Sequence, residues 1–335
     1  MSATLREVAA RAGVSIRTVS NVVTGSPKVS TETRRRVQEL LDEMGYQPNH
    51  VARTLRNGRS GLIALVLPEL DVPYFAELTR AVIERAARSG YTVVIDQTDG
   101  DPQRERDLVT RGSRAALFDG LIFSPIGLGE ADLADRPSKT PVVLLGEREI
   151  GRSLDHVVID NVAAARLATQ HLASIGRRRI AAIGHQPDEM HQTARLRTRG
   201  YLEALAAAGL APEERLMRGV QFFHRADGAA AMAGLLALDA PPDAVFCYND
   251  LLALGALREI LRRGLRVPQD IALVGFDDIE DGRYATPSLT TIAPDKAQIA
   301  RLAVDLLLRR LDGDTTPPVE LSADFSLIVR ESTTG

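Results

Sequence analysis

Residues 15–21 gather side chains that can hydrogen-bond to the edges of nucleic-acid bases. The short or polar groups belong to Ser15, Ile16, Arg17, Ser20 and Asn21. A guanidinium donates to O6 and N7 of guanine, and a carboxamide pairs with N6 and N7 of adenine. Such contacts require a helix whose N-terminal end enters the DNA major groove. The stretch therefore predicts base reading, provided that its neighbours build that helix.

The flanking residues predict two helices joined by a tight turn. Thr4 and Glu7 form the T-x-x-E capping-box pattern, so we expect a first helix to begin at Leu5 and to end at Gly13. Ser15 can cap a second helix over residues 16–23, and the short connection forces a steep crossing. This arrangement is typical of a helix-turn-helix.

A third helix completes the small module. Ser30 can cap it, and we expect it to run to about Met44 before Gly45 ends it. The apolar side chains at helical spacing, which would cover the first two helices, are Val37, Leu40, Leu41 and Met44. The sequence therefore predicts three helices around one core.

Positive and negative charge are unevenly distributed along the chain. The whole chain carries −3, but residues 1–60 contain ten Lys or Arg and five Asp or Glu, a balance of +5. The remaining residues contain 41 − 10 = 31 basic and 44 − 5 = 39 acidic side chains, a balance of −8. A small basic module predicts that DNA binds at the N-terminal end.

Residues 47–59 predict a helix that forms only conditionally. The apolar and basic run contains Val51, Ala52, Arg53, Leu55 and Arg56. A helix of about eight residues is marginal alone because nucleation is costly. We expect it to become helical only where a second copy and DNA supply contacts; a solvated linker is the alternative.

From Gly61 the pattern changes to short apolar runs alternating with amphipathic stretches, as in parallel sheets covered by helices. The expected strands are 62–67, 91–96, 120–124, 142–145, 157–159, 179–183, 244–247 and 271–274. The expected helices are 74–89, 103–117, 162–174, 195–208, 228–237 and 251–263. The sequence therefore predicts an α/β core of two lobes.

Three polar residues lie just beyond predicted strands of the second lobe. Asp277 and Asn249 follow strands directly, and Arg197 begins a helix after the strand at 179–183. Open α/β sheets bind ligands at the carboxyl ends of their strands. A carboxylate, an amide and a guanidinium can together bracket vicinal hydroxyls, which donate and accept hydrogen bonds.

Residues 4–56 resemble the DNA-binding headpiece and hinge of the LacI/GalR (lactose-repressor) family of bacterial transcription regulators. The matching residues are Val8-Ala9, Ala12-Gly13-Val14-Ser15, Thr18-Val19-Ser20, Val29-Ser30, Thr33-Arg34, Tyr46, Pro48, Asn49, Val51, Ala52 and Leu55. Residues 60–330 resemble the effector-binding core of the same family, which shares its fold with periplasmic sugar-binding proteins. Here the matches include Pro73-Tyr74-Phe75, Asp119-Gly120-Leu121-Ile122, Asn249-Asp250, Gly275-Phe276-Asp277-Asp278 and Thr286-Pro287-Ser288-Leu289-Thr290-Thr291-Ile292.

The resemblance implies a domain order and two sets of site residues. It implies a headpiece at 1–46, a hinge at 47–59 and a core at 60–335. In the hinge it implies that Leu55 wedges into the minor groove at the operator centre, and we expect Arg53 to contact phosphates. The implied DNA contacts are Thr4, Ser15, Ile16, Arg17, Thr18, Ser20, Asn21, Val51, Ala52, Arg53, Leu55 and Arg56. The implied effector contacts are Tyr74, Phe75, Ser124, His191, Thr193, Arg197, Phe223, Asn249 and Asp277. For Tyr74 and Phe75, packing at a helix start is the alternative, and Asp160-Asn161 is interpreted as a helix N-cap.

In cores of this family the chain crosses between the lobes three times. By analogy we place the crossings near Asp160, Thr290 and Leu321. The N-lobe would then comprise about 60–160 and 291–320, and the C-lobe about 161–289 and 321–330.

Two departures from the family limit the identification of an effector. Many sugar-responsive members have an aspartate where this chain has Leu144-Leu145-Gly146. The loop at 184–191 is longer than in purine-responsive relatives, so the alignment of His191 and Thr193 stays open. We expect a sugar or sugar derivative rather than a nucleobase, acting either as inducer or as corepressor.

Other functions lack the residues that they require. The motifs G-x-x-x-x-G-K-[ST], G-x-G-x-x-G after a strand and G-x-S-x-G are absent, so we expect neither an enzyme nor a bound cofactor. His185 and His191 have no third partner for a metal. Cys247, the single cysteine, lies in an apolar run and is interpreted as a buried structural thiol.

The expected setting is the cytoplasm, at the nucleoid. No apolar signal-peptide core and no run of eighteen apolar residues is present, which argues against export, membrane insertion and a transport component. Double-stranded operator DNA and a second copy are the expected partners, because a two-fold protein matches a pseudo-palindromic site. The C-terminal residues contain no leucine heptad of the kind that builds tetramers.

Overall fold

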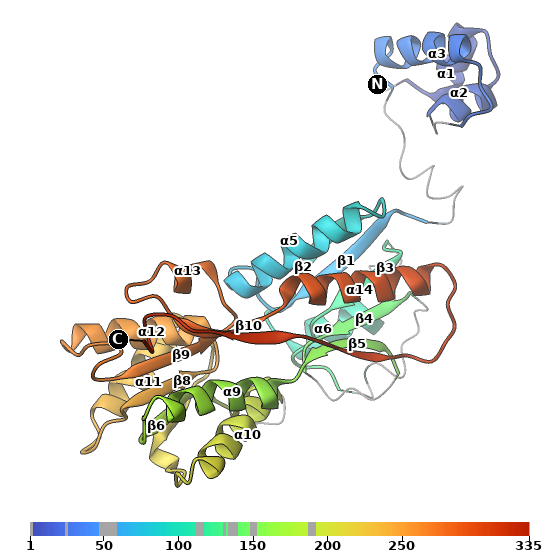
Figure 1. Cartoon of the computed structure of the whole chain (residues 1–335). Coiled ribbons are helices and arrows are strands. Elements are labelled where there is room, and N and C mark those ends of the chain that lie inside the picture. The colour runs from blue at the N-terminus through green and yellow to red at the C-terminus, as the bar shows by residue number, and fades with distance from the viewer. Residues whose placement is uncertain are drawn as a thin grey trace. The chain divides into compact units, whose positions relative to one another are not determined.

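The computed structural model describes residues 3–23, 26–46, 59–110, 117–129, 132, 140–147, 153–186 and 192–334. The chain divides into two compact units, residues 1–60, here called the headpiece, and 61–335, here called the core (Figure 1). The predicted hinge residues Val51, Ala52, Arg53, Leu55 and Arg56 lie outside the described residues, as does His191.

The headpiece consists of α1 (Leu5–Ala12), α2 (Ile16–Val23) and α3 (Thr31–Glu43). The Glu7 N–H donates to the Thr4 hydroxyl at 3.3 Å, and the Thr4 N–H donates to the Glu7 carboxylate at 2.7 Å. Ser15 caps α2, since its hydroxyl accepts the Thr18 N–H at 3.1 Å. The predicted helices and the capping box are therefore confirmed.

Apolar side chains from all three helices share one core. Those that are buried are Val8, Ala9, Ala12, Val19, Val22, Val37 and Leu41, while Leu40 and Met44 pack against them. Gly13 and Gly45, which follow α1 and α3, have φ angles of 64° and 58°. These left-handed conformations explain why glycine stands at both helix ends.

The first sheet of the core contains six parallel strands in the order β11-β5-β4-β3-β1-β2. Its strands are β1 (Leu62–Leu67), β2 (Thr92–Gln97), β3 (Gly120–Phe123), β4 (Val142–Leu145), β5 (Asp155–Ile159) and β11 (Glu320–Ala323). The helices of this lobe are α5 (Pro73–Ala87), α6 (Pro102–Thr110) and α14 (Lys296–Leu311). Helices α5 and α14, far apart in sequence, lie side by side (Figure 1).

The second sheet has the order β12-β10-β9-β8-β6-β7. Its strands are β6 (Ile180–His185), β7 (Met217–Gly219), β8 (Ala244–Cys247), β9 (Ala272–Phe276), β10 (Thr290–Pro294) and β12 (Phe325–Ile328). The main helices are α9 (Asn161–Ser174), α10 (Gln192–Ala207), α11 (Arg225–Leu236) and α12 (Asp250–Arg262), with short turns at η1 (Glu214–Leu216) and α13 (Glu280–Arg283). Strand β12 runs antiparallel to β10, so this sheet is not wholly parallel as predicted.

The chain passes between the lobes at three aspartates. Asp160 follows β5 and caps α9, and Asp295 follows β10 and caps α14. Asp324 separates β11 from β12, and its carbonyl accepts the Asp295 N–H at 2.9 Å. The second and third crossings are thus hydrogen-bonded to each other.

Two crossings differ in place from the prediction. The crossing expected near Thr290 lies later, because β10 continues to Pro294 in the second sheet. The crossing expected near Leu321 also lies later, because Leu321 still pairs with Val157 in the first sheet. The first lobe therefore resumes at about Asp295 and keeps the whole of β11.

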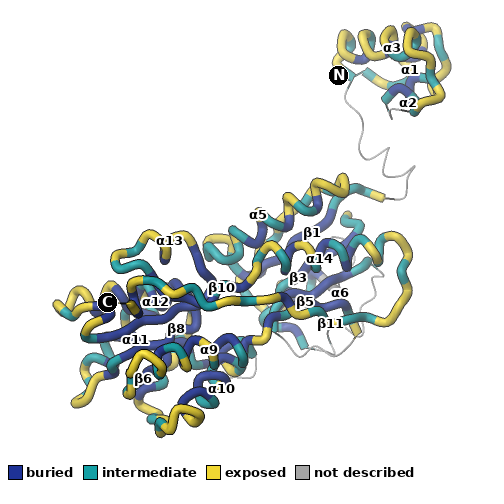
Figure 2. Tube along the Cα trace, viewed as in Figure 1, coloured by how far each residue is buried: buried dark blue, intermediate teal, exposed yellow. Residues whose placement is uncertain are grey.

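The interior of the core is built from the apolar strand runs that the sequence predicts (Figure 2). Strands β3, β4 and β8 are buried at every position. Cys247 lies within β8 and is buried, which confirms its interpretation as a structural thiol. In the described part of the chain, no helix has the length and apolar character needed to cross a membrane.

Candidate DNA-binding surface and effector site

The N-terminal end of α2 presents an exposed surface. Ile16 is 45% exposed, and Arg17 is exposed without a hydrogen bond or ion pair to any described residue. The hydroxyls of Ser15 and Thr18 lie 2.9 Å apart and bond to each other, which fixes their positions at the helix start. The predicted base-reading residues Ser15, Ile16, Arg17 and Thr18 thus share one helix end.

Three other predicted DNA contacts are less available than the sequence suggests. Ser20 is only 8% exposed because it faces the helical core, so it offers little surface for a base contact in this structure. Asn21 is half-buried. Thr4 is exposed, but its hydroxyl already takes part in the capping box of α1.

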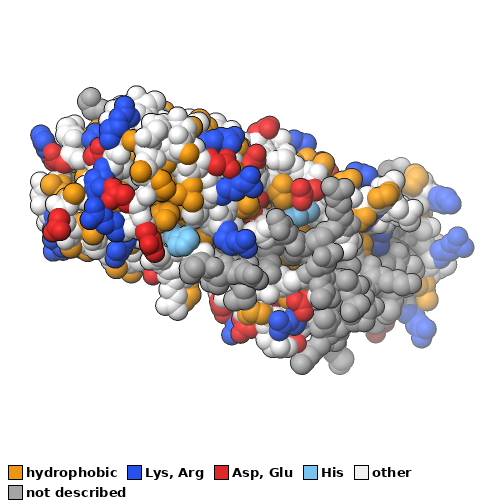
Figure 3. Space-filling view, turned by 90° about the horizontal axis from the view of Figure 1, so that it is seen from below, with side chains coloured by type: hydrophobic (Ala, Val, Ile, Leu, Met, Phe, Trp, Pro, Cys, Tyr) orange, Lys and Arg blue, Asp and Glu red, His pale blue; other side chains and the backbone are white. Residues whose placement is uncertain are grey.

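The positive charge of the headpiece is only partly neutralised within it. Arg11 pairs with Glu43 at 2.6 Å, and Arg35 pairs with Glu39 at 2.8 Å. Four exposed cations have no ion pair with residues described in this unit, namely Arg6, Arg17, Lys28 and Arg36. On the part of the core visible in Figure 3, by contrast, Lys and Arg intermingle with Asp and Glu. These four cations leave positive charge in the headpiece free for phosphates.

In the core, Asp277 lies directly after β9, at the carboxyl end of the second sheet. It is 8% exposed, and its backbone is held at a φ of 114°. Its N–H donates to the Ile292 carbonyl at 2.8 Å, and its own carbonyl accepts from the Lys296 ammonium. The carboxylate makes no hydrogen bond to a described residue, and burial raises its pKa to about 6 although Arg197 and Lys296 oppose the change.

Arg197, in the second turn of α10, is held by three contacts. Its Nε donates to Asn161 Oδ1 at 2.7 Å, and a terminal nitrogen donates to the Tyr248 carbonyl. Its guanidinium carbon lies 3.4 Å from the centre of the Phe276 ring. Burial lowers the pKa of the guanidinium, while the nearby Asp277 and other anions raise it. The structure thus places the two predicted residues of opposite charge together.

Aromatic side chains from both lobes lie around Asp277 and Arg197. Tyr74 and Phe75, at the start of α5, are half-buried and meet edge to face at 5.3 Å. Burial, then Asp277 and Glu147, raises the pKa of the Tyr74 hydroxyl, so Tyr74 lies beside the acids of the site. Phe223 from the second lobe contacts Tyr248 at 6.5 Å between ring centres.

Of the remaining predicted effector residues, Asn249 stabilises the fold, and Ser124 and Thr193 make no side-chain hydrogen bond to a described residue. Asn249 caps α12, since its Oδ1 accepts the Leu252 N–H at 2.8 Å, and its Nδ2 donates to the Phe223 carbonyl at 2.9 Å. Its amide therefore serves the fold first. Ser124 after β3 and Thr193 in α10 are both half-buried.

Sequence reasoning missed Glu147 and the role of Asn161. Glu147 Oε1 accepts the Ile159 N–H at 3.1 Å, and its carboxyl faces Asn161 and Arg197. Asp160 is the N-cap of α9 as interpreted, but Asn161 is buried and holds Arg197 instead of serving the cap. The position of Glu147 just beyond a predicted strand was a usable signal.

Lys296 and Glu77 complete the charges around the site. The Lys296 ammonium pairs with the Glu77 carboxylate at 2.8 Å and also donates to the Asp277 carbonyl. Its charge is therefore already neutralised. No three His, Cys, Asp or Glu side chains come together as a metal site within the described ranges.

Comparison with known proteins assigns this architecture to a class. Residues 4–49 match the lacI family of bacterial regulatory proteins, and residues 169–333 match the periplasmic binding protein-like domain. The HTH-type transcriptional repressor CytR of Escherichia coli (strain K12) is 35% identical over 336 residues, covering 99% of this chain and 96% of the relative. The HTH-type transcriptional repressor PurR of Mannheimia succiniciproducens is 32% identical, covering 98% of each.

Solved structures show the same similarity. The lac repressor dimer bound to operator and the anti-inducer ONPF has a TM-score of 0.87 at 29% identity, covering 100% of both chains. The transcriptional regulator CelR in complex with cellobiose has a TM-score of 0.72 at 34% identity, covering 98% of this chain and 99% of that one. The chain belongs to the lacI family of bacterial transcription regulators, which are DNA-binding repressors and not enzymes.

Proposed function

We propose that this repressor binds a pseudo-palindromic operator as a homodimer in the cytoplasm and that a small molecule bound between its lobes controls it. The observation that most supports this proposal is the state of Asp277. The residue is 8% exposed, and its carboxylate is unpaired with described residues and lies near Arg197. A buried carboxylate without a partner is costly to the fold. A ligand that donates hydrogen bonds to it would offset that cost.

The proposed effector is a sugar or sugar derivative. The second lobe offers an acceptor at Asp277 beside the cation Arg197, and Tyr74 and Phe75 of the first lobe offer ring faces. Hydroxyl groups match this set because they both donate and accept, and sugar rings present apolar faces to aromatic groups. The related regulator CelR was solved with cellobiose, which fits the same class.

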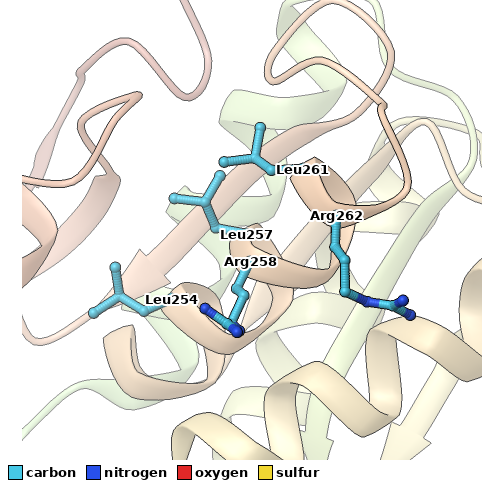
Figure 4. A pocket seen from close by; sticks show the side chains of 5 residues that line it. All are labelled: Leu254, Leu257, Arg258, Leu261 and Arg262. Atoms are coloured by element: carbon cyan, nitrogen blue, oxygen red, sulfur yellow. The ribbon is translucent and has the colours of Figure 1, made fainter.

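Helix α12 is the proposed dimer surface of the second lobe. Its leucines line a shallow groove of about 460 Å³ together with two arginines: Leu254, Leu257, Arg258, Leu261 and Arg262 (Figure 4). Leu261 is 44% exposed and forms one apolar strip with the half-buried Leu254, which a partner would cover. A second copy of the chain is the proposed occupant, because the related lac repressor was solved as a dimer on its operator.

A two-stage screen tests the proposal. Dye-based melting is measured against sugars, sugar phosphates and nucleobases, since a ligand of the folded state raises the melting temperature and the chain has no Trp for quenching. Compounds that shift melting are then added to operator gel shifts. The proposal expects at least one sugar to change both readouts. A nucleobase that does so instead would contradict the sugar assignment.

A further inference from the structure

Glu147 is built into the first lobe by contacts on either side of it. It follows Gly146, whose φ of 92° turns the chain after β4 and whose carbonyl accepts from the His156 ring. The Glu147 carboxylate accepts the Ile159 N–H at 3.1 Å, beside the first crossing between lobes. These contacts fix the acid at the carboxyl end of the first sheet, which is the end that faces ligands in open α/β folds.

Groups from several elements face this carboxylate. They are Arg197 of α10, Asn161 of α9, Tyr74 of α5 and Glu320 of β11. Arg197 does not close an ion pair with it: its Nε is bonded to Asn161 at 2.7 Å, and another nitrogen is bonded to the Tyr248 carbonyl. In the described chain, Glu147 therefore has hydrogen bonds but no salt bridge.

Resting on the function proposed above, we infer that Glu147 is an effector-binding acid of the first lobe, which, with Asp277 of the second, selects uncharged hydroxyl-bearing effectors over phosphorylated ones. Two carboxylates would flank such a ligand, one from each lobe. Hydroxyl donors satisfy both acids, whereas a phosphate would be repelled by them. The cations compensate only in part: Lys296 is paired with Glu77 at 2.8 Å, and the single charge of Arg197 leaves one net negative charge on the two ionised acids.

The electrostatics agree with a role in binding rather than in folding. Burial raises the pKa of Glu147 to about 7, against the hydrogen bond from Ile159 and the charge of Arg197. A carboxyl whose pKa is raised on folding stabilises the fold below its ordinary pKa of 4.5 and loses that contribution as the pH rises through 7. Near neutral pH the ionised acid therefore lowers the stability of the fold. A residue kept only for structure would not be expected to lower it.

The first test uses the full-length chain without ligand. Glu147→Gln keeps the acceptor for the Ile159 N–H and removes the charge, so it should melt higher than the wild type at pH 8, with the difference shrinking at pH 5. Glu214→Gln, which changes an exposed glutamate outside the site, should melt like the wild type. A variant Glu147→Gln that melts below the wild type at both pH values would assign Glu147 to the fold and overturn the inference.

The second test uses matched neutral and anionic probes at pH 8, where Glu147 is ionised. Ribose with ribose 5-phosphate and glucose with glucose 6-phosphate are compared by melting shift and calorimetry. The sugar that binds should bind at least about tenfold better than its phosphate, and Glu147→Gln should weaken the sugar about tenfold. Tighter binding of a phosphate overturns the inference. A panel without binders contradicts the proposed effector class, and the melting comparison then still decides whether Glu147 serves the fold.

Discussion

At the residue scale, the proposed effector residue Asp277 combines features that cost stability. Its backbone has a φ of 114°, its carboxylate is unpaired among described residues, and burial raises its pKa to about 6. A strained backbone and a buried, unpaired acid at one residue are typical of positions kept for function. The residue was predicted from its place after a strand, because open α/β sheets bind ligands at the carboxyl ends of their strands.

Replacing Asp277 should reveal this cost as a pH-dependent gain. A pKa of about 6, against an ordinary 3.8, corresponds to roughly 3 kcal/mol of stability that is present at low pH and lost as the pH rises through 6. Asp277→Asn, which tolerates positive φ, should therefore melt higher than the wild type at pH 8 and equally at pH 4. Melting curves across this range check it; a parallel loss at every pH would contradict the account.

Arg17 should read a base and not only a phosphate. It is exposed at the start of α2 without a described partner, so Arg17→Ala should weaken operator binding by roughly 1–3 kcal/mol and relax the preference at one base pair. Binding is measured on operators changed one base pair at a time. Arg36→Ala removes a comparable exposed arginine from α3 and should leave the preference unchanged. Equal weakening of every sequence by Arg17→Ala would show phosphate contact instead.

Other residues could not be assigned from the sequence because their roles depend on neighbours. Asn249 looked like a ligand contact, but the fold uses both ends of its amide. Asn161 looked like part of a cap, yet it holds Arg197 from another helix. Ser20 looked exposed at helical spacing, and the packing of α1 and α3 buries it. Apart from the local cap of Asn249 on Leu252, each outcome was set by a contact between segments distant in the chain.

At the scale of elements, strong local patterns predicted structure well. Strands β1, β4 and β8 have the predicted bounds, and the headpiece helices begin where their caps predict. The sequence analysis did not identify α14 or strands β7, β10, β11 and β12. Strand β12 is half-exposed and short, and β10 is held by its pairing with β9 and β12. Such elements are defined by partners that local periodicity does not contain.

Helix α12 should hold the two copies together. Leu254→Arg places a charge in the leucine groove, so the protein should become monomeric at micromolar concentration and lose operator affinity, because one headpiece reaches only one half-site. Sedimentation velocity measures the mass. Leu167→Arg, at an exposed leucine of α9, is the matched control and should remain dimeric. A dimeric Leu254→Arg protein would remove α12 from the interface.

For the whole molecule, the positive charge lies in the unit that is expected to bind DNA, and the negative charge lies in the remaining chain. The basic headpiece carries +5 and the remaining chain carries −8, so salt-dependent affinity for DNA should reside in the first unit. The residues between the units are predicted to link the two activities. An effector can shift the balance between DNA-competent and DNA-incompetent states only by its difference in affinity for them.

The hinge prediction assigns DNA bending to one leucine. Leu55→Ala should reduce both operator affinity and the bend angle while effector binding stays unchanged, because an apolar wedge opens a base step only if its side chain is large. Circular-permutation gel shifts measure the bend. Arg53→Ala should lower affinity with the bend retained. A normal bend in Leu55→Ala complexes would exclude the wedge.

Operator titration of Asp277→Asn with and without effector tests the central claim most directly. The effector is a sugar identified by the melting screen, and calorimetry on the same preparations measures its binding. We predict wild-type operator affinity for the variant in the absence of effector, since residues 1–60 form a separate unit, together with loss of effector binding and of the operator response. Retained effector binding with a normal operator response would contradict the claim that this carboxylate controls the repressor.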